Sequence, residues 1–232
     1  MTYRSISANG WIQALPLHWA GLKMESSEFQ MIAKYSLGIQ LYRKDIKCVC
    51  GKQSDGYGHH ATFCASGGDL SGRHRDVQNC LFKLAQEAQF HVTTEKGYNV
   101  EDQSRAGDVV IHDFSTGKDL YLDITKVNPQ AASYRDMVAT DPGSVLVKAV
   151  QDKHDKYDGD FVGKHDAKFA AFAMETTGGF HEECLPIMKK LARKISGSKS
   201  IPFHEQLKRM FTKLSVVSVK RTAKALLARA NC

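Results

Sequence analysis

The sequence has no hydrophobic run long enough to cross a membrane, because no window holds the roughly 18 consecutive apolar residues that a spanning helix requires. Its first residues, MTYRSISANGW, lack the apolar core of a secretion signal. It also has no repeat of solenoid period and no collagen-like, coiled-coil or low-complexity stretch. We therefore expect an intracellular globular protein without a membrane partner, and no motif indicates its compartment.

Cysteine is sparse, with six in 232 residues. A single residue separates Cys48 from Cys50, and this spacing suits a metal clip better than a disulfide framework. The rest of the composition, 42% hydrophobic and 25% charged, is typical of globular proteins. The length allows one large domain or two small ones, and either arrangement can bury a core.

The net charge of +7 is unevenly distributed. Residues 186–232 contain 12 Lys and Arg and one acid, whereas residues 1–185 contain 20 basic and 24 acidic residues. A basic C-terminal segment on a slightly acidic body favours contact with a polyanion, nucleic acid first among them. Lys208 and Arg209 are its candidate phosphate contacts. The alternative is a lysine-rich helix that only keeps the surface hydrated.

Four segments differ in character. They are an N-terminal helical segment (1–44), a Cys- and His-rich segment (45–75), an α/β core (76–185) and a basic helical extension (186–232). Apolar periodicity predicts helices near 26–37, from Asp76 onward, and near 144–157, 181–195 and 201–229, the last of which could break at Val216. It predicts strands near 91–94, 108–112, 120–125 and 168–174, with a hairpin turn at 115–118. The predicted fold class is mixed α/β.

The segment 45–75 carries the ligand types of a structural zinc site. Cys48 and Cys50 precede His59, His60 and Cys64, and zinc prefers four tetrahedral nitrogen and sulfur donors. The segment has little apolar periodicity, so a bound metal is the evident source of its stability. We prefer His60 as the third ligand and retain His59 as the alternative.

Two aspartates are candidates for a second metal. Asp108 begins one predicted strand and Asp123 lies within the next, so a hairpin could bring both carboxylates to one divalent cation. Such hard oxygen ligands suit Mg²⁺ or Mn²⁺, which can activate water for phosphodiester cleavage. Glu95 is a third oxygen donor within reach. The alternative is that these carboxylates are simply solvated at the ends of a hairpin.

The order of these motifs resembles the restriction-like endonuclease domain of site-specific non-LTR retrotransposons, which belongs to the PD-(D/E)xK nuclease superfamily. The likeness covers about residues 10–190. The matching positions are the zinc knuckle Cys48, Cys50, His60 (or His59) and Cys64, then Arg73-His74, Arg105-Ala-Gly-Asp108, Asp123-Ile-Thr, Lys153–Tyr157 and Glu175–Gly179. The resemblance implies a restriction-endonuclease-like core, a mixed sheet flanked by helices, preceded by a zinc knuckle.

Two departures from the superfamily pattern concern the catalytic site. The proline expected before Asp108 is missing, and the position two after Asp123, where the standard motif has lysine, is Thr125. Lys126 should point to the opposite face of its strand unless a bulge rotates it. The resemblance implies that the lysine has moved to the following helix, where Lys153 is the first candidate and Lys156 the second.

The resemblance implies a Mg²⁺- or Mn²⁺-dependent DNA endonuclease, either of homing type or derived from a mobile element. Arg73, His74 and Arg105 would contact DNA phosphates. DNA is the expected partner, and a homodimer is left open because one site cuts one strand. The alternatives are a zinc-containing DNA-binding module with an inactive site, a scaffold that binds an acidic protein, and a nuclease selective for branched DNA.

Overall fold

A four-stranded mixed sheet lies at the centre of the computed structural model, which describes residues 10–18, 20–42, 46–66, 69–94, 107–158 and 167–230. Strands β3 (Val92–Thr94), β4 (Val109–Ser115) and β5 (Lys118–Val127) form an antiparallel meander. The turn between β4 and β5 has Thr116 and Gly117 in the left-handed region, which confirms the predicted hairpin.

Strand β6 (Lys168–Glu175) pairs with β5 in parallel and completes the sheet order β3-β4-β5-β6. Parallel neighbours require a long crossover connection. Here the connection carries the short helices η3 (Ala132–Tyr134) and α3 (Arg135–Thr140) and the longer α4 (Ser144–Tyr157).

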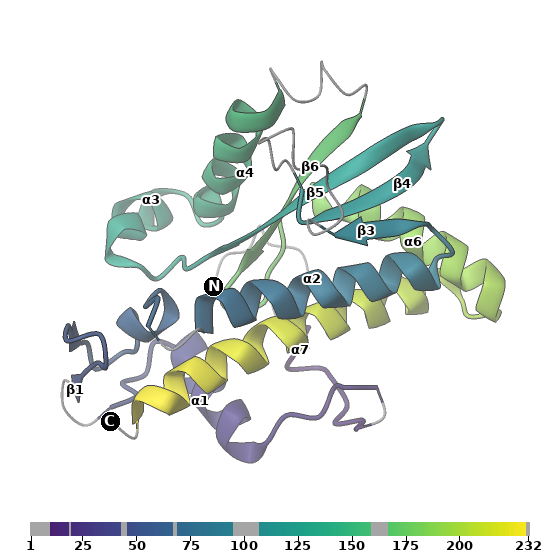
Figure 1. Ribbon diagram of the computed structural model, residues 1–232. Coiled ribbons are helices and arrows are strands. Elements are labelled where there is room, and N and C mark those ends of the chain that lie inside the picture. Colours follow the sequence, from purple (N-terminus) through teal and green to yellow (C-terminus); the bar gives the residue numbers. More distant parts are fainter. Residues whose placement is uncertain are drawn as a thin grey trace.

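Helices cover both faces of the sheet (Figure 1). Helices α2 (Asp69–Glu87), α6 (Cys184–Lys199) and α7 (Phe203–Ala230) pack on one face, and α4 packs on the other. Strand β5 follows the pleat: Leu120, Leu122 and Ile124 join the core under α2, α6 and α7, whereas Tyr121 and Val127 join the core under α4. The predicted mixed α/β architecture with helices flanking a mixed sheet is therefore confirmed.

The N-terminal part forms a smaller unit around α7. Helix α1 (Ser26–Ser36) begins with a capping box between Glu25 and Glu28, and Gly38 follows its end with positive φ. The Cys/His segment contains the two-residue strands β1 (Ile46–Lys47) and β2 (Gln53–Ser54) and the short helix η1 (His60–Thr62). Trp11, Ile32 and Ala61 pack with one flank of α7 in a separate apolar cluster.

Three helices differ from their predicted extents. Helix α2 begins at Asp69, so Asp76 lies inside it and forms an ion pair with Arg221 instead of capping its start. The predicted border between residues 75 and 76 therefore falls within α2. Helix α6 begins at Cys184 and continues through Gly197 to Lys199. Helix α7 does not break at Val216, because that side chain is fully buried in the cluster with α1.

Two predicted site residues, Glu95 and Arg105, lie outside the described residues. Within the described part of the chain, no helix has the length and apolar character that crossing a membrane requires.

The turn after β6 is a point of close packing. Gly178 has φ of +94°, and a Cβ there would lie 2.5 Å from Ser215 Oγ and 3.1 Å from Trp11 Cδ1. We expect Gly178→Ala to lower the free energy of unfolding by about 3 kcal/mol, because it combines left-handed strain with overpacking against α7. Urea denaturation measures the change.

Gly197 provides the matched control for this substitution. It lies in α6, and nothing stands within 4 Å of a Cβ built on it. Gly197→Ala should raise stability by about 0.5–1 kcal/mol through helix propensity. Equal effects of the two substitutions would contradict the packing assigned to the turn.

Candidate functional site

The Cys/His segment brings four ligand atoms together. The sulfurs of Cys48, Cys50 and Cys64 and a ring nitrogen of His60 all lie within 4.8 Å of one another. Cys48 Sγ and Cys64 Sγ are 3.7 Å apart, and Cys50 Sγ is 3.2 Å from His60 Nε2. A tetrahedral zinc ion with Zn–S bonds of about 2.3 Å would hold its sulfurs roughly 3.8 Å apart. The cluster can therefore hold a metal ion such as zinc.

His60, and not its neighbour, completes this cluster. The ring of His59 stacks on Tyr57 at 6.2 Å and meets Tyr35 edge-on at 6.3 Å, so it belongs to an aromatic contact outside the thiol cluster. The preference for His60 as the ligand candidate is confirmed.

Asp55 holds the backbone that carries the histidine ligand. Its carboxylate accepts hydrogen bonds from the backbone N–H groups of Tyr57, His59 and His60. Burial acts to raise the pKa of Asp55, but these N–H donors outweigh it and lower the pKa below its usual value. The ligand loop is thus organised by a charged acceptor that the sequence reading did not single out.

Two of the cluster thiols, Cys50 and Cys64, have pKa values shifted in opposite directions. Burial raises the pKa of Cys64, but a backbone N–H at Ser66, the neighbouring thiols and Arg229 lower it to about 6. The pKa of Cys50 is raised, because the Lys52 backbone N–H is outweighed by burial and by the other two cysteines. Arg229, near the end of α7, also donates to the Ser66 carbonyl at 2.7 Å. The last turn of α7 therefore supports the cluster.

We expect one zinc ion per chain in protein purified without chelator. His60→Ala should lower the zinc content and the thermal stability, because it removes one of the four donors. His59→Ala should keep the zinc, since that ring lies outside the cluster. Elemental analysis of the two variants measures the difference, and zinc loss in His59→Ala alone would contradict this ligand set.

A second cluster lies where β4 and β5 begin to pair. Val109 pairs with Leu122, so Asp108 and Asp123 stand next to each other one step further along the ladder. The Asp108 backbone N–H donates to the Leu122 carbonyl at 2.7 Å, and Asp108 Oδ2 accepts from the Ile124 N–H at 2.6 Å. Asp123 is 8% exposed and shares the strand face that packs toward α4. The predicted juxtaposition of the two carboxylates is present.

Each carboxylate of this pair has a cationic or imidazole partner. Lys153 Nζ, from α4, lies 2.7 Å from Asp123 Oδ2, and His74 Nε2, from α2, lies 2.9 Å from Asp108 Oδ1. Burial raises the pKa of Asp123, and the Asp108 charge adds to this, while Lys153 and His74 act in the opposite direction. Side chains from helices on opposite faces of the sheet thus contact the two neighbouring aspartates.

The other lysines near this cluster point elsewhere. Lys126 extends to the opposite face of β5, as alternation requires, and its Nζ donates to the Ser218 carbonyl and to Thr222 Oγ1 of α7. Burial first, and the nearby Arg73 charge second, lower the pKa of Lys126 well below its usual value. Lys156 is exposed, and its Nζ lies 4.7 Å from the centre of the Tyr157 ring.

The predicted phosphate contacts occupy different environments. Arg73 is buried at 3% exposure, so in this conformation it cannot present a guanidinium fork to a phosphate at the surface. This corrects the expectation that Arg73 contacts a DNA phosphate, whereas the neighbouring His74 is partly exposed. Lys208 and Arg209 are exposed on α7, and Arg209 forms an ion pair with Glu205 at 2.6 Å.

Two polar centres near the site, buried Asn128 and half-buried His154, were missed by the sequence reading. Asn128 accepts the Tyr35 hydroxyl at 2.9 Å and donates to Thr62 Oγ1 at 2.8 Å, and so ties the end of β5 to α1 and to the Cys/His segment. His154 lies between Asp158 and Glu183, at 2.7 and 3.0 Å. Burial acts to lower the pKa of His154, but both carboxylates raise it above its usual value. Only their tertiary partners distinguish these residues from ordinary polar positions.

The chain matches no protein-family model and no curated protein. A function must therefore be argued from the motifs and from the geometry of the two clusters.

Proposed function

We propose that the protein is a metal-dependent DNA endonuclease of the PD-(D/E)xK type that hydrolyses phosphodiester bonds, either of homing type or derived from a mobile element. The observation that carries this proposal is the meeting of Asp108, Asp123 and Lys153. Two carboxylates from paired strands stand side by side, and the amine of Lys153 lies 2.7 Å from one of them.

The donor set fits a hard divalent cation. Asp123 and Asp108 offer carboxylate oxygens on neighbouring strands, and oxygen ligands suit Mg²⁺ or Mn²⁺. When bound, such an ion supplies water activation and charge stabilisation for phosphodiester hydrolysis. Burial disfavours the ionised form of Asp123, so the ionised carboxylate is stabilised by a neighbouring cation. In the structure this cation is the ammonium group of Lys153. Glu95 remains the third candidate oxygen donor.

Lys153 takes the place of the lysine that the superfamily motif puts on the strand. Its amine is held at the carboxylate pair, where a cation can orient the attacking water and offset charge developing on the phosphate. The Lys126 amine donates a hydrogen bond to α7 on the other face of the strand, so in the observed conformation it does not reach the carboxylate pair. Lys156 is a weaker candidate, since it is exposed and lies over Tyr157.

Other features agree with a DNA enzyme. The mixed sheet flanked by helices has the general architecture that the family resemblance implies. The Cys/His cluster lies at one end of α7, next to the basic C-terminal part of the chain. In this proposal His74, which is partly exposed and contacts Asp108, is the member of the Arg73-His74 motif that binds a phosphate. A single site cuts one strand, so double-strand cleavage would require a homodimer or two binding events.

One observation favours a second candidate function. Both aspartates are already partnered, Asp108 by His74 and Asp123 by Lys153, and such a closed arrangement also suits a zinc-containing DNA-binding module that has lost its catalytic metal. Calorimetry separates the two candidates. The enzyme should bind Mg²⁺ or Mn²⁺, and Asp123→Asn should abolish that binding.

We expect purified protein to nick or linearise supercoiled plasmid with Mg²⁺ or Mn²⁺. Asp123→Asn should lose at least about 100-fold in rate, because one ligand carboxylate becomes a neutral amide. Lys153→Met should lose a comparable factor through removal of the amine. Gel electrophoresis of timed reactions measures the rates.

Lys148→Met is the matched control for Lys153→Met. Lys148 lies on the same helix, and its amine pairs with Asp152 at 2.9 Å, away from Asp123. Its loss should leave the cutting rate within about twofold, because exposed i,i+4 pairs contribute little. Equal losses in the two variants would contradict the role of Lys153. A panel of branched, nicked and linear DNA then identifies structure-selective cutting.

A further prediction concerns pH. Lys153 lowers the pKa of Asp123 against the larger effect of burial, so its removal should raise that pKa further. Metal binding requires the ionised carboxylate, and Mg²⁺ affinity falls as pH drops through this pKa. In Lys153→Met, calorimetry at several pH values should therefore show the fall beginning at higher pH than in wild type. An unchanged or lower midpoint would contradict the pairing.

A further inference from the structure

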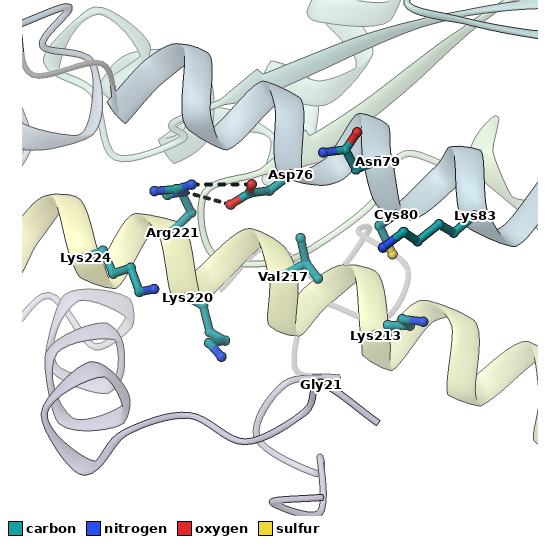
Figure 2. A pocket seen from close by; sticks show the side chains of 10 residues that line it. All are labelled: Gly21, Asp76, Asn79, Cys80, Lys83, Lys213, Val217, Lys220, Arg221 and Lys224. Carbon is teal, nitrogen blue, oxygen red and sulfur yellow. Dashed lines mark hydrogen bonds and ion pairs between the residues drawn. The ribbon is translucent and has the colours of Figure 1, made fainter. Parts of the chain in front are cut away.

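A pocket with several basic residues lies between α2 and α7, closed on one side by the N-terminal segment at Gly21 (Figure 2). Lys83 comes from α2, and Lys213, Lys220 and Lys224 come from α7. Cys80 and Val217 also line it. One acidic residue, Asp76, is among the lining residues, and it is engaged by Arg221 at 2.7 Å.

The basic side chains differ in what neutralises them. Lys220 donates to the Lys23 carbonyl at 2.7 Å, and Lys224 lies 3.8 Å from the buried carboxylate of Glu28. Lys83 and Lys213 have neither a hydrogen bond nor an ion pair to any residue that the structure describes. Two unneutralised amines facing one pocket favour an anionic occupant, because they repel one another and attract negative charge.

The pocket is separate from the aspartate pair. On α2, His74 and Gln78 both contact Asp108, and Asp76 and Lys83 line the pocket. At 3.6 residues per turn, these two pairs lie about half a turn apart around the helix axis. An anion in the pocket would therefore sit on the far side of α2 from the proposed cutting site.

The basic residues of α7 form a row and do not converge on one point. Lys213, Lys220 and Lys224 follow one another at intervals of seven and four residues, and Arg209 continues the same face four residues earlier. From Lys213 to Lys224 the helix rises about 17 Å. Such a row suits a repeating polyanion whose phosphates follow one another at a few ångströms of rise. Lys208 lies outside this face, so of the two predicted contacts only Arg209 joins the row.

We propose that the α2–α7 pocket binds the phosphodiester backbone of duplex DNA, with Lys83 and Lys213 as its principal contacts. The site serves affinity and not base recognition, because amines pair with phosphates of any sequence. The proposal does not depend on the nuclease function. A protein unable to cut would still bind DNA here, and a nuclease that binds DNA elsewhere would lack this contact.

The test is the DNA affinity of full-length zinc-loaded protein without divalent metal, measured by fluorescence anisotropy on a 30-base-pair duplex at several salt concentrations. Lys83→Glu/Lys213→Glu should raise the Kd at least about tenfold and make the slope of log affinity against log salt shallower by about two, one per lost phosphate contact. Lys83→Gln/Lys213→Gln should show the same slope change with a smaller loss of affinity.

Lys34→Glu/Lys189→Glu is the matched control, since it changes the net charge equally on α1 and α6, outside the pocket. Equal losses in the control and pocket variants, or an unchanged salt slope, would overturn the proposal. A pocket variant that loses affinity for polyglutamate or single-stranded RNA but keeps its affinity for duplex DNA would also overturn it. Circular dichroism melting confirms that each variant is folded, and the glutamine pair supplies the result if the glutamate pair is not.

Asp123→Asn keeps failure of this proposal distinct from failure of the proposed nuclease. That variant should bind the duplex with wild-type affinity through the pocket even though it should not cut. Loss of plasmid cutting with DNA binding intact leaves the pocket supported. If Lys83→Gln/Lys213→Gln still cuts plasmid and binds the duplex with unchanged affinity, the pocket proposal is overturned and the nuclease proposal is not.

Discussion

Strand β5 is covered on both faces, and this constraint determines the chemistry of the proposed site. One side of the strand packs against α2, α6 and α7, and the other packs against α4. A carboxylate in its middle is largely shielded from water, which favours a cation beside Asp123, and Lys153 of the covering helix provides one at 2.7 Å. The same alternation sends Lys126 to α7. A buried strand thus places its acid and its own lysine on opposite faces of the sheet.

Helix α7 connects the sheet to the Cys/His cluster. One part of it packs under the sheet with α2 and α6, another buries Trp11 and α1, and its last turn brings Arg229 to the Ser66 carbonyl. Asn128 makes a second connection, from the end of β5 to Tyr35 and Thr62. The basic C-terminal segment is therefore part of the core. Its charged side chains lie at positions that the packing leaves exposed, such as Lys208 and Arg209, and the pocket at Lys213 lies where α7 runs beside α2.

The strands and the long helices could be predicted from periodicity, because the apolar residues repeat with the period that each element requires. Two of the errors occur where a residue with a local preference has a tertiary partner. Asp76 is a good N-cap residue, but it pairs with Arg221 inside α2. Val216 disfavours helix, but α1 buries it completely. Packing outweighs propensities of a few tenths of a kcal/mol in both cases.

The sequence by itself determined the Cys and His residues that can bind a metal ion and the opposite strand faces of Asp123 and Lys126, because ligand chemistry is local and the pleat has a period of two. The family resemblance limited the proposed catalytic lysine to two candidate positions on one helix, Lys153 and Lys156. Only the tertiary structure decided that Lys153 meets Asp123, that His60 joins the thiols while His59 stacks on Tyr57, and that Arg73 is buried. These outcomes depend on how segments that are distant in the chain pack against one another. The spacing of residues within one segment does not specify that packing.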